Sequence, residues 1–85
     1  MFGGIAVDNK EKYNEIFINC FEIEGEQLNQ DLTYNSIDNW DSVGHMGLIA
    51  ELEDAFDIMM ETDDIIDFSS YEKGKEILAK YQIEI

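Results

Sequence analysis

Residues 40–56 read WDSVGHMGLIAELEDAF, and this stretch decides the fold class. Its apolar residues recur at three- and four-residue spacing, at Val43, Met46, Ile49, Leu52 and Phe56. This spacing predicts one buried face of an amphipathic helix that begins at Asp41-Ser42, two residue types that favour helix caps. His45 falls on another face and is expected to be exposed. Gly44 and Gly47 lie inside the helix, and each weakens it by about 1 kcal/mol relative to alanine.

Two further amphipathic helices are predicted, one on each side of this stretch. Residues 8–23 place apolar side chains on one face, at Tyr13, Ile16, Phe17, Cys20 and Phe21. Asp8 is suited to cap the start of this helix, and Gly25 marks a stop beyond it. The last helix is predicted over 69–82, because Ser69 and Glu72 have the spacing of a capping box.

The last helix has one apolar face, formed by Tyr71, Ile77, Leu78 and Tyr81. Gly74 lies on the same face and allows close packing. A short helix of one or two turns, with a cap at Thr62, is predicted over 62–66.

Residues 24–41 are polar and lack strand alternation, so they predict a long ordered loop. Its isolated apolar residues are expected to pin it to the core, at Leu28, Leu32, Tyr34, Ile37 and Trp40. The predicted fold is therefore all-α, a small four-helix bundle with three longer helices, one short helix and a long first loop. We expect a single domain over residues 8–82, preceded by a loose end over 1–7.

Charge and length exclude several classes of protein. The 85 residues include 20 acids against 5 lysines, for a formal net charge of −15. This balance excludes nucleic-acid binding and a polybasic membrane-surface module. No apolar run is long enough to span a membrane, and the start has no positively charged leader. We therefore expect a cytoplasmic monomer. From residue 13 to 72 there is no lysine, which indicates either a soluble surface or one that attracts basic partners.

Most reactive side chains are expected to be structural. Cys20 lies on the apolar face of the first helix, with no base or cation near it in sequence. Ser42 and His45 would share one helical turn, so they do not form a hydrolase triad. Neither His45 nor Cys20 has the spacing of a metal site. The sequence therefore predicts neither an enzyme nor a metal centre.

The exception is Asp41-Ser42-Val43 at the start of a helix, followed by a hydrophobic run that ends in acids and Phe56. This arrangement resembles the acyl and peptidyl carrier protein family, and the match continues through 62–64 and 68–70 to cover roughly residues 8–82. The resemblance implies that Ser42 carries phosphopantetheine, donated from coenzyme A by a separate phosphopantetheinyl transferase. The arm would shuttle an acyl or aminoacyl thioester between partner enzymes. Asp41 would cap the helix and form part of the surface that the transferase reads.

The resemblance also implies other site residues. Partner enzymes that load or accept the cargo would present basic patches to residues on and before the second helix, at Asp38, Val43, Met46, Glu51, Glu53, Asp54 and Asp57. Phe68 and Ile65 would line a cleft that shelters an acyl chain. For Met46 and Phe68, ordinary core packing is the alternative.

Two departures from fatty-acid carriers favour a specialised pathway. Asn39-Trp40 precedes Asp-Ser where such carriers have a small pair, and Gly44 and Gly47 stand where they tend to have acids. The alternative function is an acidic protein-interaction module of carrier-like fold without a cofactor.

Overall fold

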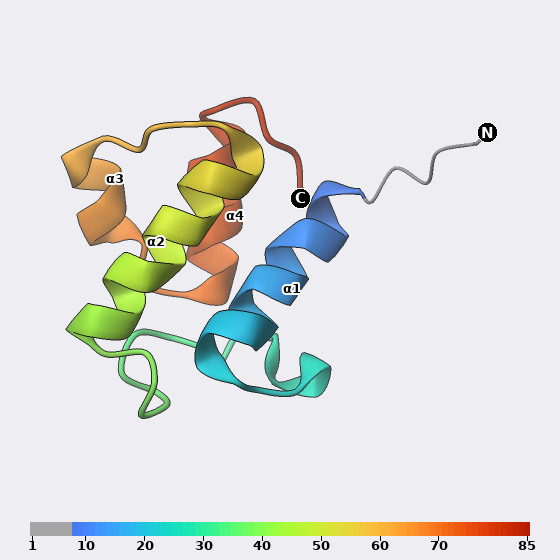
Figure 1. Cartoon of the computed structure of the whole chain (residues 1–85), viewed down its shortest axis with the longest axis vertical. Coiled ribbons are helices and arrows are strands. Elements are labelled where there is room, and N and C mark those ends of the chain that lie inside the picture. The colour runs from blue at the N-terminus through green and yellow to red at the C-terminus, as the bar shows by residue number, and fades with distance from the viewer. Residues whose placement is uncertain (1–7) are drawn as a thin grey trace.

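The computed structural model describes residues 8–85, and these residues form four α-helices and no β-strand. The helices are α1 (Asn9–Phe21), α2 (Ser42–Phe56), α3 (Thr62–Asp67) and α4 (Tyr71–Ala79), with a short 3-10 turn, η1 (Gly25–Gln27), after α1. Figure 1 shows α1 and α2 side by side, α4 behind them, and α3 on the outer side of α2. The prediction of a helical bundle with three longer helices and one short helix is confirmed.

Two other predictions concern the ends of the chain and membranes. The loose end predicted for residues 1–7 lies outside the described residues. Within residues 8–85, no helix is long and apolar enough to cross a membrane.

A cluster of aromatic side chains lies at the centre of the core. Phe17 of α1 is fully buried, and its ring packs against five others, those of Tyr13, Phe21, Trp40, Phe68 and Tyr71. Tyr13, Phe17 and Phe21 are four residues apart, so α1 presents all three to the core on one face. Each such aromatic residue buries a large apolar area, which is how a chain this short obtains a stable core.

The ends of α1 are fixed by local hydrogen bonds. Asp8 caps the start as predicted, because its carboxylate accepts a 2.8 Å bond from the Glu11 N–H. The helix stops before Gly25, as predicted, but Gly25 does not form its C-terminal cap. The helix ends at Phe21, and the C-cap residue Glu22 adopts the left-handed conformation with φ 56° and donates its N–H to the Ile18 carbonyl. Gly25 instead begins η1.

The first turn of α2 differs from the predicted buried face. Asp41 is the N-cap and Ser42 the first helical residue, as expected. Further along, Leu48, Ile49 and Leu52 are buried, but Val43 and Met46 are 80 % and 57 % exposed. The reason is that His45, rather than either apolar residue, faces the buried Trp40.

The N-terminal boundaries of α3 and α4 are each shifted by one residue from the prediction. Glu61 occupies the N-cap position of α3 in place of Thr62. Ser70 caps α4 in place of Ser69, through a 2.9 Å bond from the Lys73 N–H. Ser69 cannot cap because the chain there is held extended against the loop: its carbonyl accepts from the Tyr34 N–H at 2.8 Å.

The last helix is also shorter than predicted. It ends at Ala79 rather than near residue 82, and Gln82 then adopts a left-handed conformation. Tyr81 follows the helix and is only half-buried. Gly74 does permit close packing, because a Cβ atom at this position would overlap Phe68 and the Tyr13 hydroxyl.

The long loop is pinned to the core by some of the expected residues. Leu32 and Trp40 are buried, and Leu28 and Ile37 are partly buried. Tyr34 is 39 % exposed instead of buried: its backbone N–H bonds to Ser69, and its ring packs against His45 at the surface.

A buried acid ties α3 to the end of α4. Asp64 accepts hydrogen bonds from the Lys80 ammonium at 2.5 Å and from the Tyr81 hydroxyl at 2.6 Å. The hydrogen bond from Lys80, followed by that from Tyr81, lowers the pKa of the Asp64 carboxyl. The carboxylate form of Asp64 therefore stabilises the position of α3.

Asp64→Asn is expected to lower the melting temperature at neutral pH, and the deficit should shrink as the pH falls below about 4. A carboxyl whose pKa is lowered by folding contributes stability that is complete above its unfolded pKa and is lost as the pH falls through its folded pKa. Thermal melts of both proteins across this range measure the effect, with the exposed Asp63→Asn as a charge-matched control. A deficit that is the same at every pH would contradict the assignment.

Candidate functional site

Ser42 stands exposed at the N-terminus of α2. The Asp41 carboxylate accepts a 2.8 Å bond from the Gly44 N–H, and the Asp41 carbonyl accepts the first helical bond, from His45. The N–H groups of Ser42 and Val43 precede that first bond. A helix end of this kind attracts anions, because its free N–H groups and the helix dipole both favour negative charge.

Gly44 allows the loop to approach this helix end closely. A Cβ atom at Gly44 would overlap the backbone oxygen of Asn39. The Asn39 side chain in turn donates a 2.7 Å bond to the Phe21 carbonyl at the end of α1. Gly44 and Asn39 therefore connect the end of α1 to the start of α2 and fix the position of Ser42. Gly47 has open space around it and no such role.

A cavity of about 320 Å³ opens beside Ser42. On one side it is lined by Tyr34 of the loop and by Ser42, His45 and Met46 of α2. On the other side it is lined by Ile65 and Ile66 of α3 and by Phe68 and Ser69 beyond it. Its lining is mainly apolar, and it has the size of a small ligand pocket.

Ile65 and Phe68, the two residues predicted to line an acyl cleft, both belong to this cavity. Ile65 is half-buried, and Phe68 is fully buried, so Phe68 serves the core and the cavity together. Phe68 follows α3 directly rather than lying within it.

The predicted exposure of His45 is wrong. Its ring is half-buried between α2, the long loop and α3. The Trp40 indole N–H donates to His45 Nδ1 at 3.0 Å, so Nδ1 is an acceptor. Nε2 of the neutral ring then carries the hydrogen and donates to the Ile65 carbonyl at 2.8 Å. Sequence analysis missed this role, although a buried tryptophan N–H needs an acceptor and His45 is only five residues away.

The acidic residues predicted to meet partners do not gather around Ser42. Asp41 adjoins Ser42 and is exposed, and the exposed Asp38 lies in the loop before it, whereas Asp54 and Asp57 are exposed at the far end of α2. Glu51 faces α1, where it lines a small hollow with Ile16, Asn19 and Cys20. Glu53 is half-buried, and its carboxylate accepts a 2.9 Å bond from the Met60 N–H.

Exposed apolar side chains also lie next to Ser42. Val43 and Met46, two of the predicted partner contacts, are joined there by Ile66 of α3, which is 71 % exposed. Sequence analysis missed Ile66, because the pattern of a six-residue helix does not define its buried face.

The other reactive side chains, Cys20 and His45, are poorly placed to act as a nucleophile or a base. Cys20 is half-buried, and desolvation, with a smaller contribution from Glu51, raises the pKa of its thiol, so the reactive thiolate is disfavoured. Both ring nitrogens of His45 are hydrogen-bonded, so neither is free to activate Ser42. Within residues 8–85, no group of three or more His, Cys, Asp or Glu side chains is placed to hold a metal ion.

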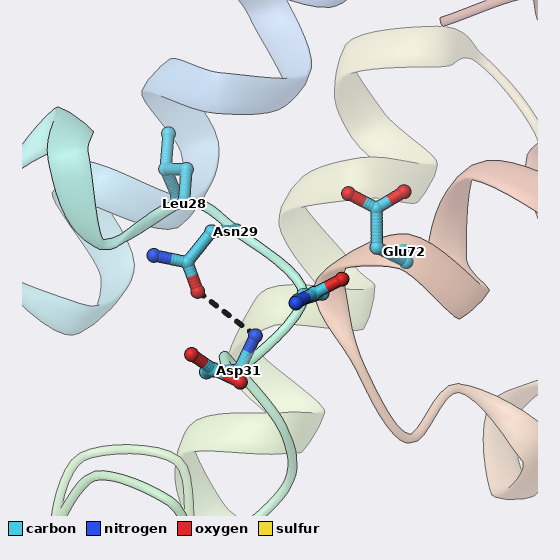
Figure 2. Close-up of a pocket in the computed structure, with 5 residues that line it drawn as sticks. Leu28, Asn29, Asp31 and Glu72 are labelled. Carbon is cyan, nitrogen blue, oxygen red and sulfur yellow. Dashed lines mark hydrogen bonds between the residues drawn. The ribbon is translucent and has the colours of Figure 1, made fainter.

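A larger hollow of about 720 Å³ lies elsewhere, between the loop and the start of α4 (Figure 2). Residues 28–31 of the loop and Glu72 of α4 line it, and Asn29 Oδ1 accepts from the Asp31 N–H at 2.8 Å. This hollow is polar and open, and it holds no basic or nucleophilic side chain. We therefore take the smaller apolar cavity beside Ser42 as the candidate functional site.

No family model, curated protein or solved structure matches this chain. Support for a function therefore comes from the geometry around Ser42 and from the sequence pattern there.

Proposed function

We propose that the protein is a carrier that bears a phosphopantetheine arm on Ser42 and passes an acyl or aminoacyl thioester between partner enzymes. The observation that carries this proposal is an exposed serine at a helix N-terminus that opens directly beside an apolar cavity. The sequence resemblance around Asp41-Ser42-Val43 supports it independently.

The residues at the helix end fit a phosphodiester. Asp41 uses the Gly44 N–H for capping, and the N–H groups of Ser42 and Val43 remain for an anionic oxygen. The arm, when bound, would supply the thiol that forms the thioester. The half-buried Cys20, with its raised pKa, would take no part.

The surroundings of Ser42 also favour a substrate of another enzyme over an enzyme. A serine nucleophile needs an adjacent base. His45 is the nearest candidate base, and both of its nitrogens are engaged by Trp40 and Ile65. The phosphopantetheinyl transferase would therefore supply the base, and this chain would supply the exposed hydroxyl and the helix end.

The charge distribution suits brief encounters with partner enzymes that carry basic patches. The acids on and near α2 would attract such partners at long range, while Val43 and Met46 would make apolar contact beside Ser42. Because α2 carries no acid between Ser42 and Glu51, the partners would differ from those of housekeeping fatty-acid carriers. This supports a specialised pathway.

The test is transfer from coenzyme A by a promiscuous phosphopantetheinyl transferase. The wild-type protein is expected to gain one phosphopantetheinyl group, seen as a mass increase and as one new reactive thiol. Ser42→Ala is expected to gain none. Ser69→Ala is the matched control, because Ser69 lines the same cavity and its loss should leave the modification intact. An unmodified wild type, or modification of Ser42→Ala, would refute the proposal.

The second candidate is an acidic interaction module of the same fold that never carries a cofactor. It is favoured by the 20 acids against 5 lysines, a charge excess far beyond what solubility requires. Such a module would remain unmodified in its host and bind one basic partner stoichiometrically.

A further inference from the structure

We propose that His45 sets the depth of the cavity beside Ser42, so that the cavity accepts only a short, uncharged apolar group. The inference deepens the proposed function by naming the class of cargo, and it rests on that function for its biological meaning. The binding property itself belongs to the unmodified protein and is tested there.

The imidazole ring of His45 lies between the cavity and the core. His45 lines the cavity, and its ring lies nearly parallel to that of Trp40, with 6.3 Å between the ring centroids and 15° between the planes. Trp40 has no exposed surface and belongs to the core. The imidazole therefore separates the cavity from the core residues around Trp40.

Hydrogen bonds hold the His45 ring in this position. Trp40 donates to one nitrogen at 3.0 Å, and the other donates to the Ile65 carbonyl at 2.8 Å. Rotating the ring out of the way would leave the buried indole N–H without an acceptor, which is costly in a protein interior. The edges of Phe68 and Tyr34 also pack against it, with centroids 6.2 and 5.6 Å away.

The groups that line the cavity determine which cargo it favours. With both nitrogens engaged, His45 offers the cavity only its ring carbons. Among the described residues, those that line the cavity include no carboxylate to pair with an ammonium group. Met46, Ile65 and Ile66 present apolar side chains, and the hydroxyl groups belong to Tyr34, Ser42 and Ser69. An alkyl chain is favoured over an aminoacyl group.

The test uses neutral straight-chain alcohols, because they mimic an alkyl chain without its charge or its covalent link. Binding of butanol, hexanol, octanol and decanol to the unmodified protein is followed by NMR of the Met46 and Ile65 methyl groups. Trp40 is the sole tryptophan, so its single indole N–H signal reports whether the bond to His45 is intact.

In the wild type, affinity is expected to rise by roughly fourfold per added methylene while the chain fits, and then to level off before decanol. In His45→Ala the levelling should disappear, and the ratio of decanol to hexanol affinity should increase by about tenfold or more. His45→Gln is the matched control. Its amide can accept from Trp40 and donate to Ile65, so it should keep the wild-type ratio and indole signal.

Three results would overturn the inference. The first is a wild-type affinity that rises without levelling through decanol, which needs no variant to observe. The second is a folded His45→Ala protein with the wild-type affinity ratio, and His45→Ser gives the same test if the alanine variant does not fold. The third is the absence of alcohol-induced changes at Met46 and Ile65.

Failure here is distinguishable from failure of the proposed function. If the transferase does not modify Ser42 but alcohol binding levels off as expected, the carrier proposal fails and the His45-limited cavity remains. If Ser42 is modified and alcohol affinity does not level off, the carrier proposal survives and the limit on cargo length fails.

Discussion

Replacing Trp40 with alanine is expected to lower the unfolding free energy by at least about 4 kcal/mol. Trp40 is fully buried and packs against the rings of Phe17, Phe21 and Phe68, so truncation opens a large cavity in the core. It also removes the indole donor and leaves Nδ1 of the half-buried His45 without its partner. For a domain of 85 residues, whose total stability is about 4–13 kcal/mol, this loss is close to unfolding.

Trp40→Phe separates the two parts of that effect. Phenylalanine keeps much of the ring packing but has no N–H, so the expected cost is about 1–3 kcal/mol. Urea denaturation followed by far-UV circular dichroism measures both variants against the wild type. Equal losses for Trp40→Ala and Trp40→Phe would show that the packing of the Trp40 ring against its aromatic neighbours contributes little to stability, which would contradict this prediction.

Gly74→Ala is expected to destabilise the fold by about 2–3 kcal/mol, although alanine is ordinarily the better helix former. Its Cβ would overlap Phe68 and the Tyr13 hydroxyl, both in the packed core. That hydroxyl donates a 2.6 Å bond to the Tyr71 carbonyl, so displacing Tyr13 would also strain a buried hydrogen bond.

Gly47→Ala is the matched control for Gly74→Ala, because a Cβ at Gly47 meets nothing within 4 Å. It is expected to stabilise the protein by up to about 1 kcal/mol through helix propensity alone. The same urea denaturation serves for this pair. If both alanine variants shift stability in the same direction, α1 and Phe68 do not pack as closely against α4 at Gly74 as the structure shows.

The periodic parts of the fold could be predicted from the sequence, because local spacing determines them. Tyr13, Phe17 and Phe21 lie four residues apart, and the structure buries all three. The first turn of α2 could not be predicted in this way. Val43 and Met46 fit the apolar spacing, but the partner across that turn is the N–H of Trp40, and only His45 can accept from it.

The candidate site was partly predictable for a similar reason. Asp41 caps the helix that begins at Ser42, and the two residue types predict this local arrangement directly. Whether each acid of α2 is available to a partner depends on which neighbour its side chain faces. Glu51 faces Cys20 on the α1 side, and Glu53 is bound to the Met60 N–H, and neither neighbour follows from helical spacing.

The proposal that Ser42 carries phosphopantetheine is tested most directly by the intact mass of the protein purified from its own host. We expect a mass above that of the bare chain by one phosphopantetheinyl group, with or without a short apolar acyl group, localised to the peptide that contains Ser42. A protein that is entirely unmodified and co-purifies stoichiometrically with one basic partner would contradict the account and establish the interaction module instead.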